Sequence, residues 1–463
     1  MRVEGVVRMD LRERIASKTA VVGVVGLGYV GLPLAMEFCR AGFRVIGFDI
    51  DRHKIESLGH GMSYVMDVAP ETVREALAHG RFEPTTDFER LRELDAVSIC
   101  VPTPLRKSRE PDVSYIVAAV NDLVPRIHAP MLIILESTTY PGTTEELVQA
   151  EVEKRGFCAG RDVYICFSPE RVDPGNSVFK TVNTPKVIGG ITPACADMGA
   201  LLYGQTMETI IKVGSARTAE MVKLLENTFR AVNIGLANEM ALMCERMGMD
   251  VWQVISAAAT KPFGFMPFYP GPGIGGHCIP LDPTYLSWKA KMYHFTSRFI
   301  ELATDINGSM PYHVSKLAGE ILNLEGKAVY GSDILCLGVA YKKDVNDTRE
   351  SPSLDIIRLL LRQGARVRYS DPHVPDISAS GIVAETVPLT RESVEAADCV
   401  LLLTNHSAFD YDFIARHLRV CLDTRAAFHS RGIEQHNIFR LGAPLPGPEE
   451  WRRRKTPFQD RQS

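Results

Sequence analysis

The sequence predicts an α/β protein in which two doubly wound parallel-sheet domains are joined by a helical central segment with a long helix. Short apolar runs alternate with helical patterns up to residue 212, and the same alternation returns after residue 327. Such alternation is typical of parallel sheets covered by helices on both faces. The stretch between them carries long helical patterns instead. A chain of 463 residues also exceeds what one hydrophobic core usually serves, so several domains are expected.

The first α/β domain is predicted to span residues 1–212. Residues 21–25 form an apolar run typical of a buried parallel strand. A glycine turn follows, and then a helix over Leu34–Cys39 that Gly42 ends, because glycine favours the position after a helix. The other strand-like runs of this domain are residues 44–49, 96–102, 131–137 and 162–169.

The central segment is predicted to span residues 213–326 and to be helical. Residues 218–250 contain no proline, and Gly235 is isolated within them, so one long helix is expected there. Further helices are expected over 251–259 and 297–323, the latter with a kink at Pro311. Long helices with an apolar face between two domains also favour a homodimer or a higher homo-oligomer, although packing within one chain would explain the same pattern.

The second α/β domain is predicted to span residues 327–440. The last residues, 441–463, contain proline, glycine and a basic run, and they are predicted to be a mobile tail. Within the domain, strands are expected at 333–341, 365–372, 397–404 and 420–425, with a helix over 351–364.

Composition argues against several classes of partner. Apolar residues make up 45% and charged residues 23% of the chain, and the net charge of −4 gives no reason to expect nucleic acid. No apolar run approaches the roughly 20 residues that span a bilayer, so no membrane insertion is expected. The ten cysteines show no CxxC spacing, so no metal site is expected. Without a recognisable secretory signal, the cytoplasm is the expected compartment.

A glycine cluster indicates a dinucleotide site. Gly26, Gly28 and Gly31 form GxGxxG between a predicted strand and a predicted helix, and Asp49 ends the next strand. In such a Rossmann-like arrangement the glycines let the backbone approach a pyrophosphate at the start of the helix. The Asp49 carboxylate would bind the ribose hydroxyls and repel a 2′-phosphate, so NAD is expected rather than NADP. The second domain has no such motif, which leaves it for a substrate that itself carries a nucleotide.

The stretch "PGPGIGGHCIPLDP", residues 270–283, presents one cysteine on a loop of glycine and proline. This composition forms neither a regular helix nor a central strand. In a dehydrogenase, the thiol of Cys278 can attack an aldehyde to give a thiohemiacetal, whose oxidation gives a thioester that water opens. A buried structural cysteine is the alternative, but it would not need Gly275 and Gly276 beside it. The sequence therefore favours a nucleophile.

Lys223 and Asn227 lie four residues apart in a predicted helix, so they share one face of it. Polar side chains on one helix face are ordinarily only solvated. If this face meets the cysteine loop, the two side chains would stabilise an oxyanion.

Seven segments together resemble the UDP-glucose/GDP-mannose dehydrogenase family. They occur in the family's order over nearly the whole chain, and the last three are the most specific. The resemblance implies an NAD-dependent four-electron oxidation at C6 of a nucleotide sugar. The segments are GLGYVGLP (26–33), VPTP (101–104), ESTTYPGTT (136–144), FSPER (167–171), KLLENTFRAVNIGLANE (223–239), GPGIGGHCIPLDP (271–283) and GVAYKKDVNDTRESPS (338–353).

The resemblance implies roles for residues around the cysteine. Cys278 is implied as the nucleophile, and Lys223 as the cation that stabilises the developing oxyanion. Asn227 is implied to hydrogen-bond the same oxygen or the sugar. Asp282 is implied to position water and to balance the charge of the lysine.

The resemblance also implies a base and a cofactor site. Glu170 is the implied general base for thioester hydrolysis, acting through water. Thr138 is implied to reach the same water and the nicotinamide. The implied cofactor-binding residues are Gly26, Gly28, Gly31, the backbone N–H groups of Tyr29 and Val30, and Asp49, Lys54, Thr103, Thr138 and Arg349.

For the substrate, the resemblance implies that Lys342 contacts the diphosphate and that Tyr341 lies near the base. Arg425 matches a substrate-contacting arginine, with an ordinary surface arginine as the alternative. Phe268 and Tyr269 would pack on the nucleotide sugar, unless they are simply loop core. The full implied set is Glu170, Lys223, Asn227, Phe268, Tyr269, Gly275, Tyr341, Lys342 and Arg425.

One stretch of the sequence, residues 265–290, indicates which sugar the protein uses. Residues 265–290 resemble the family members that act on UDP-N-acetylglucosamine in surface-polysaccharide synthesis, whereas the UDP-glucose members usually end this loop in Gly-Gly-Ser-Cys-Phe. UDP-N-acetylglucosamine is therefore the expected substrate. UDP-glucose, UDP-GalNAc, UDP-ManNAc and GDP-mannose stay alternatives, as do an inactive nucleotide-sugar sensor and a two-electron reductase, which need no nucleophile. Lys261 stands in a segment where UDP-glucose enzymes use an arginine of a partner subunit, so a contribution from a second subunit stays open.

Overall fold

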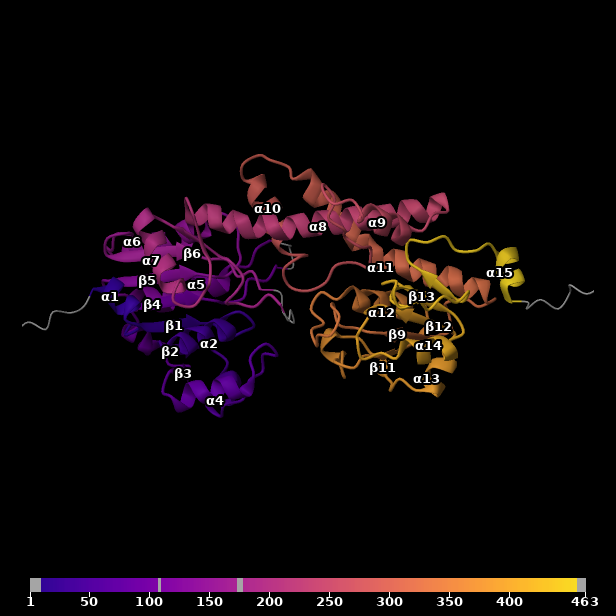
Figure 1. The fold of residues 1–463 in the computed structure, drawn as a ribbon, viewed down its shortest axis with the longest axis horizontal. Helices are drawn as coiled ribbons and strands as arrows, with labels where there is room; N and C mark the ends of the chain where they lie inside the picture. The colour runs from indigo at the N-terminus through magenta and orange to yellow at the C-terminus, as the bar shows by residue number, and fades with distance from the viewer. Residues whose placement is uncertain (1–9, 107–109, 173–177, 456–463) are drawn as a thin grey trace, which may run out of the picture. The chain divides into compact units, whose positions relative to one another are not determined.

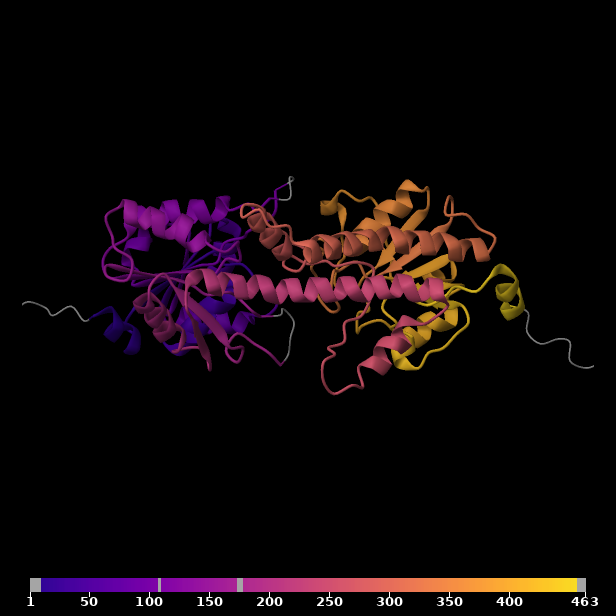
Figure 2. The ribbon, with the colours of Figure 1, turned by 90° about the horizontal axis from the view of Figure 1, so that it is seen from above.

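The computed structural model describes residues 10–106, 110–172 and 178–455. The chain forms two compact units, drawn in Figures 1 and 2. The first comprises Met1–Glu226 and Thr284–Phe295, and the second comprises Asn227–Pro283 and Thr296–Ser463. The predicted central segment is thus divided between the two units. The first nine residues, which belong to the predicted first domain, and the last eight, which belong to the predicted tail, lie outside the described part.

The first unit is built on an 8-stranded sheet in the order β3-β2-β1-β4-β5-β6-β7-β8. The pairs from β3 to β6 are parallel, β6 and β7 are antiparallel, and β7 and β8 are parallel again. The strands are β1 (Val21–Val25), β2 (Arg44–Phe48), β3 (Phe82–Thr85), β4 (Ala96–Ile99), β5 (Met131–Leu135), β6 (Val163–Phe167), β7 (Lys186–Gly190) and β8 (Ile210–Val213).

Helices cover both faces of this sheet. Alternate residues of β5 show this arrangement, because Leu132 and Ile134 belong to one buried cluster and Ile133 and Leu135 to another. Side chains that alternate along a strand point to opposite faces, so each face has its own core. The helices are α1 (Leu11–Ala16), α2 (Gly31–Ala41), α3 (Arg52–Gly59), α4 (Pro70–Ala78), α5 (Ser114–Leu123), α6 (Ala150–Lys154) and α7 (Pro193–Tyr203).

The second unit is built on a 6-stranded parallel sheet in the order β11-β10-β9-β12-β13-β14. Alternate residues of β9 again divide between two cores, with Ile334 and Cys336 in one and Leu335 and Leu337 in the other. The strands are β9 (Asp333–Leu337), β10 (Arg366–Ser370), β11 (Glu385–Thr386), β12 (Cys399–Leu402), β13 (Cys421–Asp423) and β14 (Ile438–Arg440).

The remaining helices include the two longest of the described chain. The predicted long helix is α8, and α11 continues through Pro311 without interruption. Among the described residues, none of the helices is long and apolar enough to cross a membrane. The helices are α8 (Ala216–Met247), α9 (Val251–Ala258), α10 (Asp282–Lys291), α11 (Arg298–Leu324), α12 (Pro352–Arg362), α13 (Arg391–Glu395), α14 (Tyr411–His417) and α15 (Pro448–Lys455).

The fold confirms the predicted class, two mostly parallel α/β sheets with a helical central segment, but it differs at the C-terminus. Residues 441–463 were predicted to be a mobile tail, whereas α15 packs within the second unit. Trp451 is 1% exposed, its indole N–H donates to Glu325 at 2.9 Å, and its ring lies 5.2 Å from that of Phe439. One large aromatic side chain therefore anchors a segment whose composition suggested disorder.

Replacing this anchor is expected to destabilise the second unit. Trp451→Ala removes a buried aromatic side chain and a hydrogen bond, which should lower the free energy of unfolding by about 3–5 kcal/mol. Calorimetry would measure the loss, with Arg453→Ala as the control because Arg453 is exposed on the same helix. Equal unfolding temperatures for the two variants would show that α15 does not contribute to the packed unit.

Candidate functional site

The first predicted glycine motif forms the turn between β1 and α2. Gly26 has φ of 91°, and a Cβ atom there would lie 2.7 Å from the carbonyl oxygen of Cys100. A Cβ at Gly31 would lie 1.8 Å from the carbonyl oxygen of Gly26. Both positions therefore require glycine for the turn itself. Gly28 differs, because a Cβ there would meet nothing within 4 Å. Its missing side chain thus leaves room above the turn, where the motif is expected to receive a pyrophosphate.

Asp49, at the end of β2, is buried beside this turn. Its Oδ2 accepts the Leu27 N–H at 3.0 Å and lies 3.3 Å from Lys54 Nζ, while its Oδ1 accepts the Asp51 N–H at 3.0 Å. Each carboxylate oxygen can accept two hydrogen bonds, so Oδ1 keeps capacity for a ribose hydroxyl. The structure thus brings Asp49 and Lys54 together next to the glycines.

The other predicted cofactor residues lie at the same edge of the sheet. Tyr29 and Val30 directly precede α2, whose N-terminal N–H groups favour an anion. Thr103 follows β4 and is buried, and its carbonyl oxygen accepts the hydroxyl of Tyr285 on α10. Thr138 follows β5 and is partly buried. The residues of the first unit therefore fit NAD.

Glu170, the predicted base, lies beyond the end of β6 in a buried polar cluster. Its Oε1 accepts the N–H groups of Arg171 and Val172, both at 2.8 Å, and its Oε2 lies 3.2 Å from Lys186 Nζ. Burial by itself raises the pKa of Glu170, but the charge of Lys186, these backbone donors and Lys223 together hold it below its ordinary value. A carboxylate kept in its charged form can accept a proton from water.

Sequence reasoning missed the partners of Glu170. Lys186 also lies 2.7 Å from Oε2 of Glu136, and the hydroxyl of Tyr203 donates to the other oxygen of Glu136. Glu136 is part of the quoted segment ESTTYPGTT but received no role. Lys186 begins a strand that was not predicted, and because lysine is seldom buried, the sequence gives no signal that it lies in this cluster.

The glycines of the cysteine loop are explained by contacts within the second unit. A Cβ at Gly275 would lie 2.7 Å from Cβ of Tyr341, and one at Gly276, with φ of 86°, would lie 2.7 Å from the Tyr341 ring. The Gly276 N–H donates to the carbonyl oxygen of Arg349 at 3.0 Å. Gly273, with φ of 130°, packs in the same way against Pro352. The loop therefore lies flat on the segment 338–353.

Cys278 is exposed at the end of this loop, in the turn that leads into α10. Its carbonyl oxygen accepts the Asp282 N–H at 2.9 Å. The side-chain amide of Asn227, on α8, donates to Oδ2 of Asp282, and both side chains are buried. The structure thus links three of the predicted catalytic residues in the second unit. Lys223 lies one turn earlier on α8 and is buried as well.

The predicted substrate residues of the second unit fall into two groups. Arg425 lies against the loop, because a Cβ at Gly271 would meet its Nη1 at 2.7 Å, and burial lowers the pKa of Arg425 to about 10. Phe268 and Tyr269 instead pack on α8 and α9: the ring of Phe268 lies 5.7 Å from that of Phe229, and Tyr269 stacks on Trp252 at 5.7 Å. These contacts are the packing that the alternative expected, and the Tyr269 side chain stays 48% exposed.

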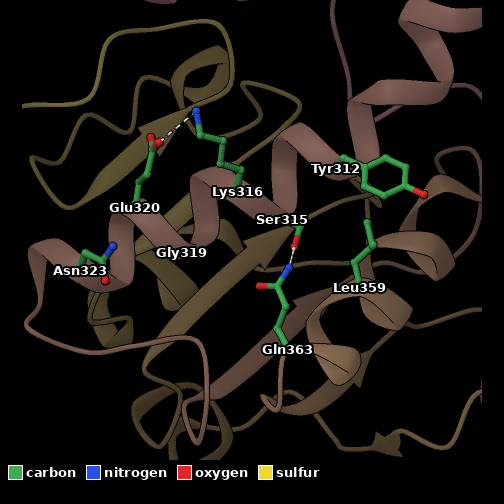
Figure 3. A pocket seen from close by; sticks show the side chains of 8 residues that line it. All are labelled: Tyr312, Ser315, Lys316, Gly319, Glu320, Asn323, Leu359 and Gln363. Carbon is green, nitrogen blue, oxygen red and sulfur yellow. Dashed lines mark hydrogen bonds and ion pairs between the residues drawn. The ribbon is translucent and has the colours of Figure 1, made fainter.

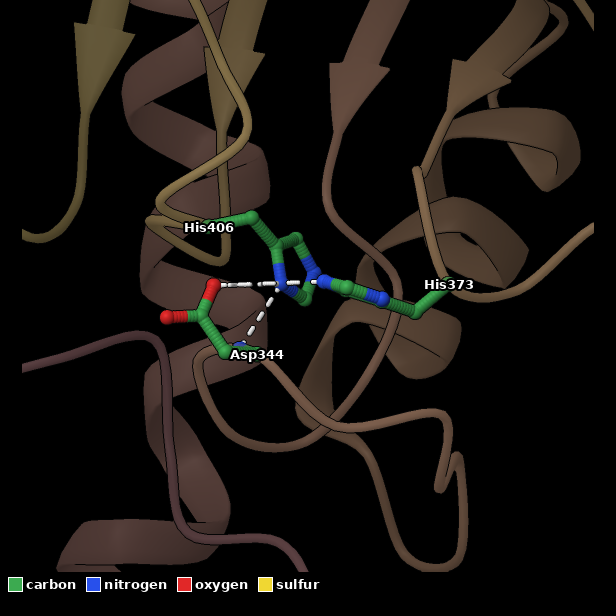
Figure 4. A group of neighbouring side chains, drawn as sticks. All are labelled: Asp344, His373 and His406. Carbon is green, nitrogen blue, oxygen red and sulfur yellow. Dashed lines mark hydrogen bonds and ion pairs between the residues drawn. The ribbon is translucent and has the colours of Figure 1, made fainter. Parts of the chain in front are cut away.

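The segment that carries Tyr341 and Lys342 is fixed by a buried histidine, shown in Figure 4. His406 Nδ1 accepts the Asp344 N–H at 2.9 Å, and its Nε2 lies 3.0 Å from Oδ2 of Asp371. Asp371 Oδ2 also accepts the Val339 N–H at 2.7 Å. Asp344, His373 and His406 bring ligand-type atoms within 4.8 Å of one another. Both nitrogens of His406 already form hydrogen bonds, so in this structure His406 holds segment 338–353 in place by joining Asp344 to Asp371.

A hollow of about 400 Å³ lies between α11 and α12 (Figure 3). An ion pair between Lys316 and Glu320 at 3.4 Å and a hydrogen bond between Ser315 and Gln363 at 3.1 Å hold its polar rim. None of the predicted site residues lines it, so the hollow belongs neither to the glycine turn and Glu170 of the first unit nor to the cysteine loop of the second. The full lining is Tyr312, Ser315, Lys316, Gly319, Glu320, Asn323, Leu359 and Gln363.

A glycine turn with a buried acid, and an exposed cysteine on a packed glycine loop, are features of a dinucleotide-dependent dehydrogenase with a covalent step. The chain matches all three domains of one family and belongs to the UDP-glucose/GDP-mannose dehydrogenase family. The NAD-binding domain matches residues 20–207, the central domain residues 217–309 and the UDP-binding domain residues 335–430. The protein is therefore an NAD-dependent nucleotide-sugar dehydrogenase.

Individual relatives agree with this family. A UDP-N-acetyl-D-mannosamine dehydrogenase of Methanococcus maripaludis is 34% identical, over 90% of this chain and 94% of the relative. An NDP-N-acetyl-D-galactosaminuronic acid dehydrogenase of Ralstonia nicotianae is 34% identical, over 89% of this chain and 97% of the relative. The solved structure of a UDP-D-ManNAc dehydrogenase from Pyrococcus horikoshii superposes with a TM-score of 0.82 at 33% identity, covering 91% and 99% of the two chains.

The cofactor preference can be tested at Asp49. Asp49→Asn removes the charge that binds ribose hydroxyls, which should lower kcat/KM for NAD by about tenfold to a hundredfold and narrow its lead over NADP. Steady-state kinetics with both cofactors would measure this, with Asp51→Asn as the control because Asp51 accepts the backbone N–H of His53 in α3. Equal rates of the unaltered enzyme with NAD and NADP would contradict the role of Asp49.

Proposed function

We propose that this protein oxidises the C6 hydroxyl of a UDP-linked 2-acetamido sugar to the carboxylate, through a thioester on Cys278. The observation that carries the proposal is the exposed thiol of Cys278 on a loop packed against segment 338–353 of the matched UDP-binding domain. An exposed cysteine on a rigid loop suits a nucleophile better than a packing residue.

The reaction takes an alcohol to an acid in two oxidations. The first converts the C6 alcohol to an aldehyde, and the thiol of Cys278 then adds to the aldehyde carbon to give a thiohemiacetal. The second oxidation gives a thioester, and water cleaves its carbon–sulfur bond to release the acid and restore the thiol. When bound, NAD would supply the hydride acceptor for each oxidation, so that one sugar, two NAD and one water would give the carboxylate, two NADH and three protons.

Each predicted residue has a role that follows from its chemistry. Lys223 carries the positive charge that stabilises the thiohemiacetal oxyanion, and Asn227 donates a hydrogen bond to the same oxygen. Asp282 holds the Asn227 amide in place through the hydrogen bond described above. Glu170 removes a proton from the water that attacks the thioester, and Thr138 orients that water.

Segment 338–353 supplies the groups for the nucleotide part. Lys342 is suited to the diphosphate because its ammonium group carries three N–H donors, and Arg349 would approach the dinucleotide from the same segment. Arg425 is assigned to the sugar, and this assignment is supported by the position of its guanidinium group against the cysteine loop at Gly271. Tyr341 is assigned to the nucleotide base of the substrate, and its ring also packs against Gly276 of the cysteine loop.

UDP-N-acetylglucosamine is the first candidate sugar, because residues 265–290 resemble the family members that use it. The relatives described above are named for N-acetylmannosamine and N-acetylgalactosaminuronic acid, so those two configurations are the nearest alternatives. All three sugars share the acetamido group at C2, which supports this class over UDP-glucose or GDP-mannose.

The protein also carries a surface suited to a second copy of itself. Exposed apolar side chains recur on α8 at intervals of four and seven residues, the spacing of one helix face. We propose that this face forms a homodimer. The side chains are Met221, Leu225, Phe229, Leu236, Met243 and Met247.

The covalent step can be tested at Cys278. Cys278→Ser should abolish acid formation while NAD still binds, because serine cannot form the thioester. Acid would be measured by mass spectrometry and NAD binding by calorimetry. Cys158→Ser is the matched control, since Cys158 is also exposed. Normal acid production by the Cys278 variant, or one NADH per sugar from the unaltered enzyme, would overturn the route.

The sugar class can be tested with a panel of UDP-GlcNAc, UDP-GalNAc, UDP-ManNAc, UDP-glucose and GDP-mannose. The best acetamido sugar should exceed UDP-glucose in kcat/KM by about tenfold or more, because a site shaped for the acetamido group loses contacts with a hydroxyl. NADH formation would be followed at equal sugar concentrations. Preference for UDP-glucose would exclude the acetamido class.

A further inference from the structure

Lys186, the first residue of β7, is buried between two carboxylates. It is 4% exposed, and its Nζ lies 2.7 Å from Glu136 Oε2 and 3.2 Å from Glu170 Oε2. Removing an ammonium group from water is costly unless it is paired and hydrogen-bonded. Its position therefore needs both partners, and only one of them, Glu170, belongs to the proposed chemistry.

The sheet topology creates this meeting point. Because β7 runs antiparallel to β6, with Cys166 opposite Gly190 and Phe167 opposite Gly189, the same register continued beyond β6 places Glu170 opposite Lys186. Glu136 follows the end of β5, whose last residue pairs with the last residue of β6. Two strand ends and one strand beginning therefore converge at the edge where the cofactor residues lie.

The surrounding contacts hold this cluster rigidly. Tyr203 donates to Glu136, and its hydroxyl lies 3.1 Å from that of Ser98. The ammonium group of Lys186 lies 5.3 Å from the centroid of the Tyr203 ring. The side chains of Lys186 and Glu136 are 5% and 0% exposed, whereas that of Glu170 is 15% exposed. Of the three charged groups, Glu170 is the one that keeps access to water.

We propose that Lys186, supported by Glu136, is a positioning residue of the reaction: its ammonium group fixes the orientation of the Glu170 carboxylate and keeps it charged for thioester hydrolysis. This rests on the proposed function, in which Glu170 is the base. Two charges 3.2 Å apart and shielded from water interact far more strongly than exposed ones, so the ammonium group lowers the affinity of Glu170 for a proton.

Lys186 and Glu136 have opposite effects on the charge of Glu170. Lys186 favours the charged form of Glu170, whereas Glu136, as a like charge, opposes it. Burial raises the pKa of Glu136, and the two carboxylates outweigh burial to raise the pKa of Lys186. The titratable or charged groups around Glu170 are Lys186 from β7, Glu136 from the segment after β5, Tyr203 from α7, Cys100 from the segment after β4, Lys223 from α8 and the neighbouring Arg171.

The test is the pH dependence of thioester hydrolysis in single turnover. At low pH the rate of hydrolysis falls as Glu170 takes up a proton, and this fall is the acidic limb of the profile. Lys186→Met should move the limb to a pH higher by about one to three units, because Glu170 then takes up a proton more readily. At pH 6 this variant should accumulate the sugar covalently attached to Cys278, seen as added mass of the intact protein. Lys186→Arg keeps the charge and should restore the position of the limb.

Glu136→Gln should shift the same limb downward, because the competing carboxylate is removed and Lys186 pairs with Glu170 alone. Opposite shifts from two neighbouring substitutions would not follow from a merely structural role. If Lys186→Met does not fold, the double variant Lys186→Met with Glu136→Gln removes the unpaired buried charge and still lacks the ammonium group, so its limb should lie above that of Glu136→Gln.

The outcome separates the inference from the function on which it rests. If Glu170→Gln removes the acidic limb but the folded Lys186→Met variant keeps it unshifted, or Lys186→Arg fails to restore it, the positioning role is wrong while the base stands. If Glu170→Gln leaves the limb intact, or the unaltered enzyme forms no covalent intermediate, the proposed chemistry itself is wrong.

Discussion

The packing of two glycines against the side chain of Tyr341 is the constraint on which the second unit's part of the site depends. Any side chain at Gly275 or Gly276 would collide with Tyr341, so the cysteine loop can lie on segment 338–353 only without one. That segment is itself held by His406, which accepts the Asp344 N–H and pairs with Asp371. The position of the thiol therefore follows from a chain of contacts that begins at a fully buried histidine.

In the first unit, the candidate site residues are held in place by charged groups and their hydrogen bonds rather than by glycine packing. Asp49 stabilises the glycine turn through the Leu27 N–H, and Lys186 joins two carboxylates that lie after β5 and β6. A buried charged side chain is stable only when it keeps its oppositely charged and hydrogen-bonding partners. The loop of the second unit thus depends on glycines, which have no side chain to collide with Tyr341. The edge of the first sheet depends instead on charged side chains that are paired with one another.

The sequence predicted the features that have local patterns. The alternation of apolar runs predicted two parallel sheets, although not the strands β3, β7, β8, β11 and β14, and the proline-free stretch 218–250 predicted α8. The glycine spacing pointed to the turn at Gly26, and the composition of 270–283 pointed to the cysteine loop. What it could not give were contacts between distant segments. Lys186 and Trp451 look like ordinary members of a polar stretch and a basic tail, and their importance appears only when β7 and α15 are packed.

The reversal of direction between β6 and β7 has a consequence for sequence change over evolution. Extra residues in the connection between Arg171 and Lys186 would leave the pairing of Glu170 with Lys186 untouched, because the ladder beyond them sets the register. One residue inserted between Lys186 and Gly189 would instead turn the lysine to the other face of the sheet. We therefore expect the pairing of Glu170 with Lys186 to survive insertions before β7 but not within its first half.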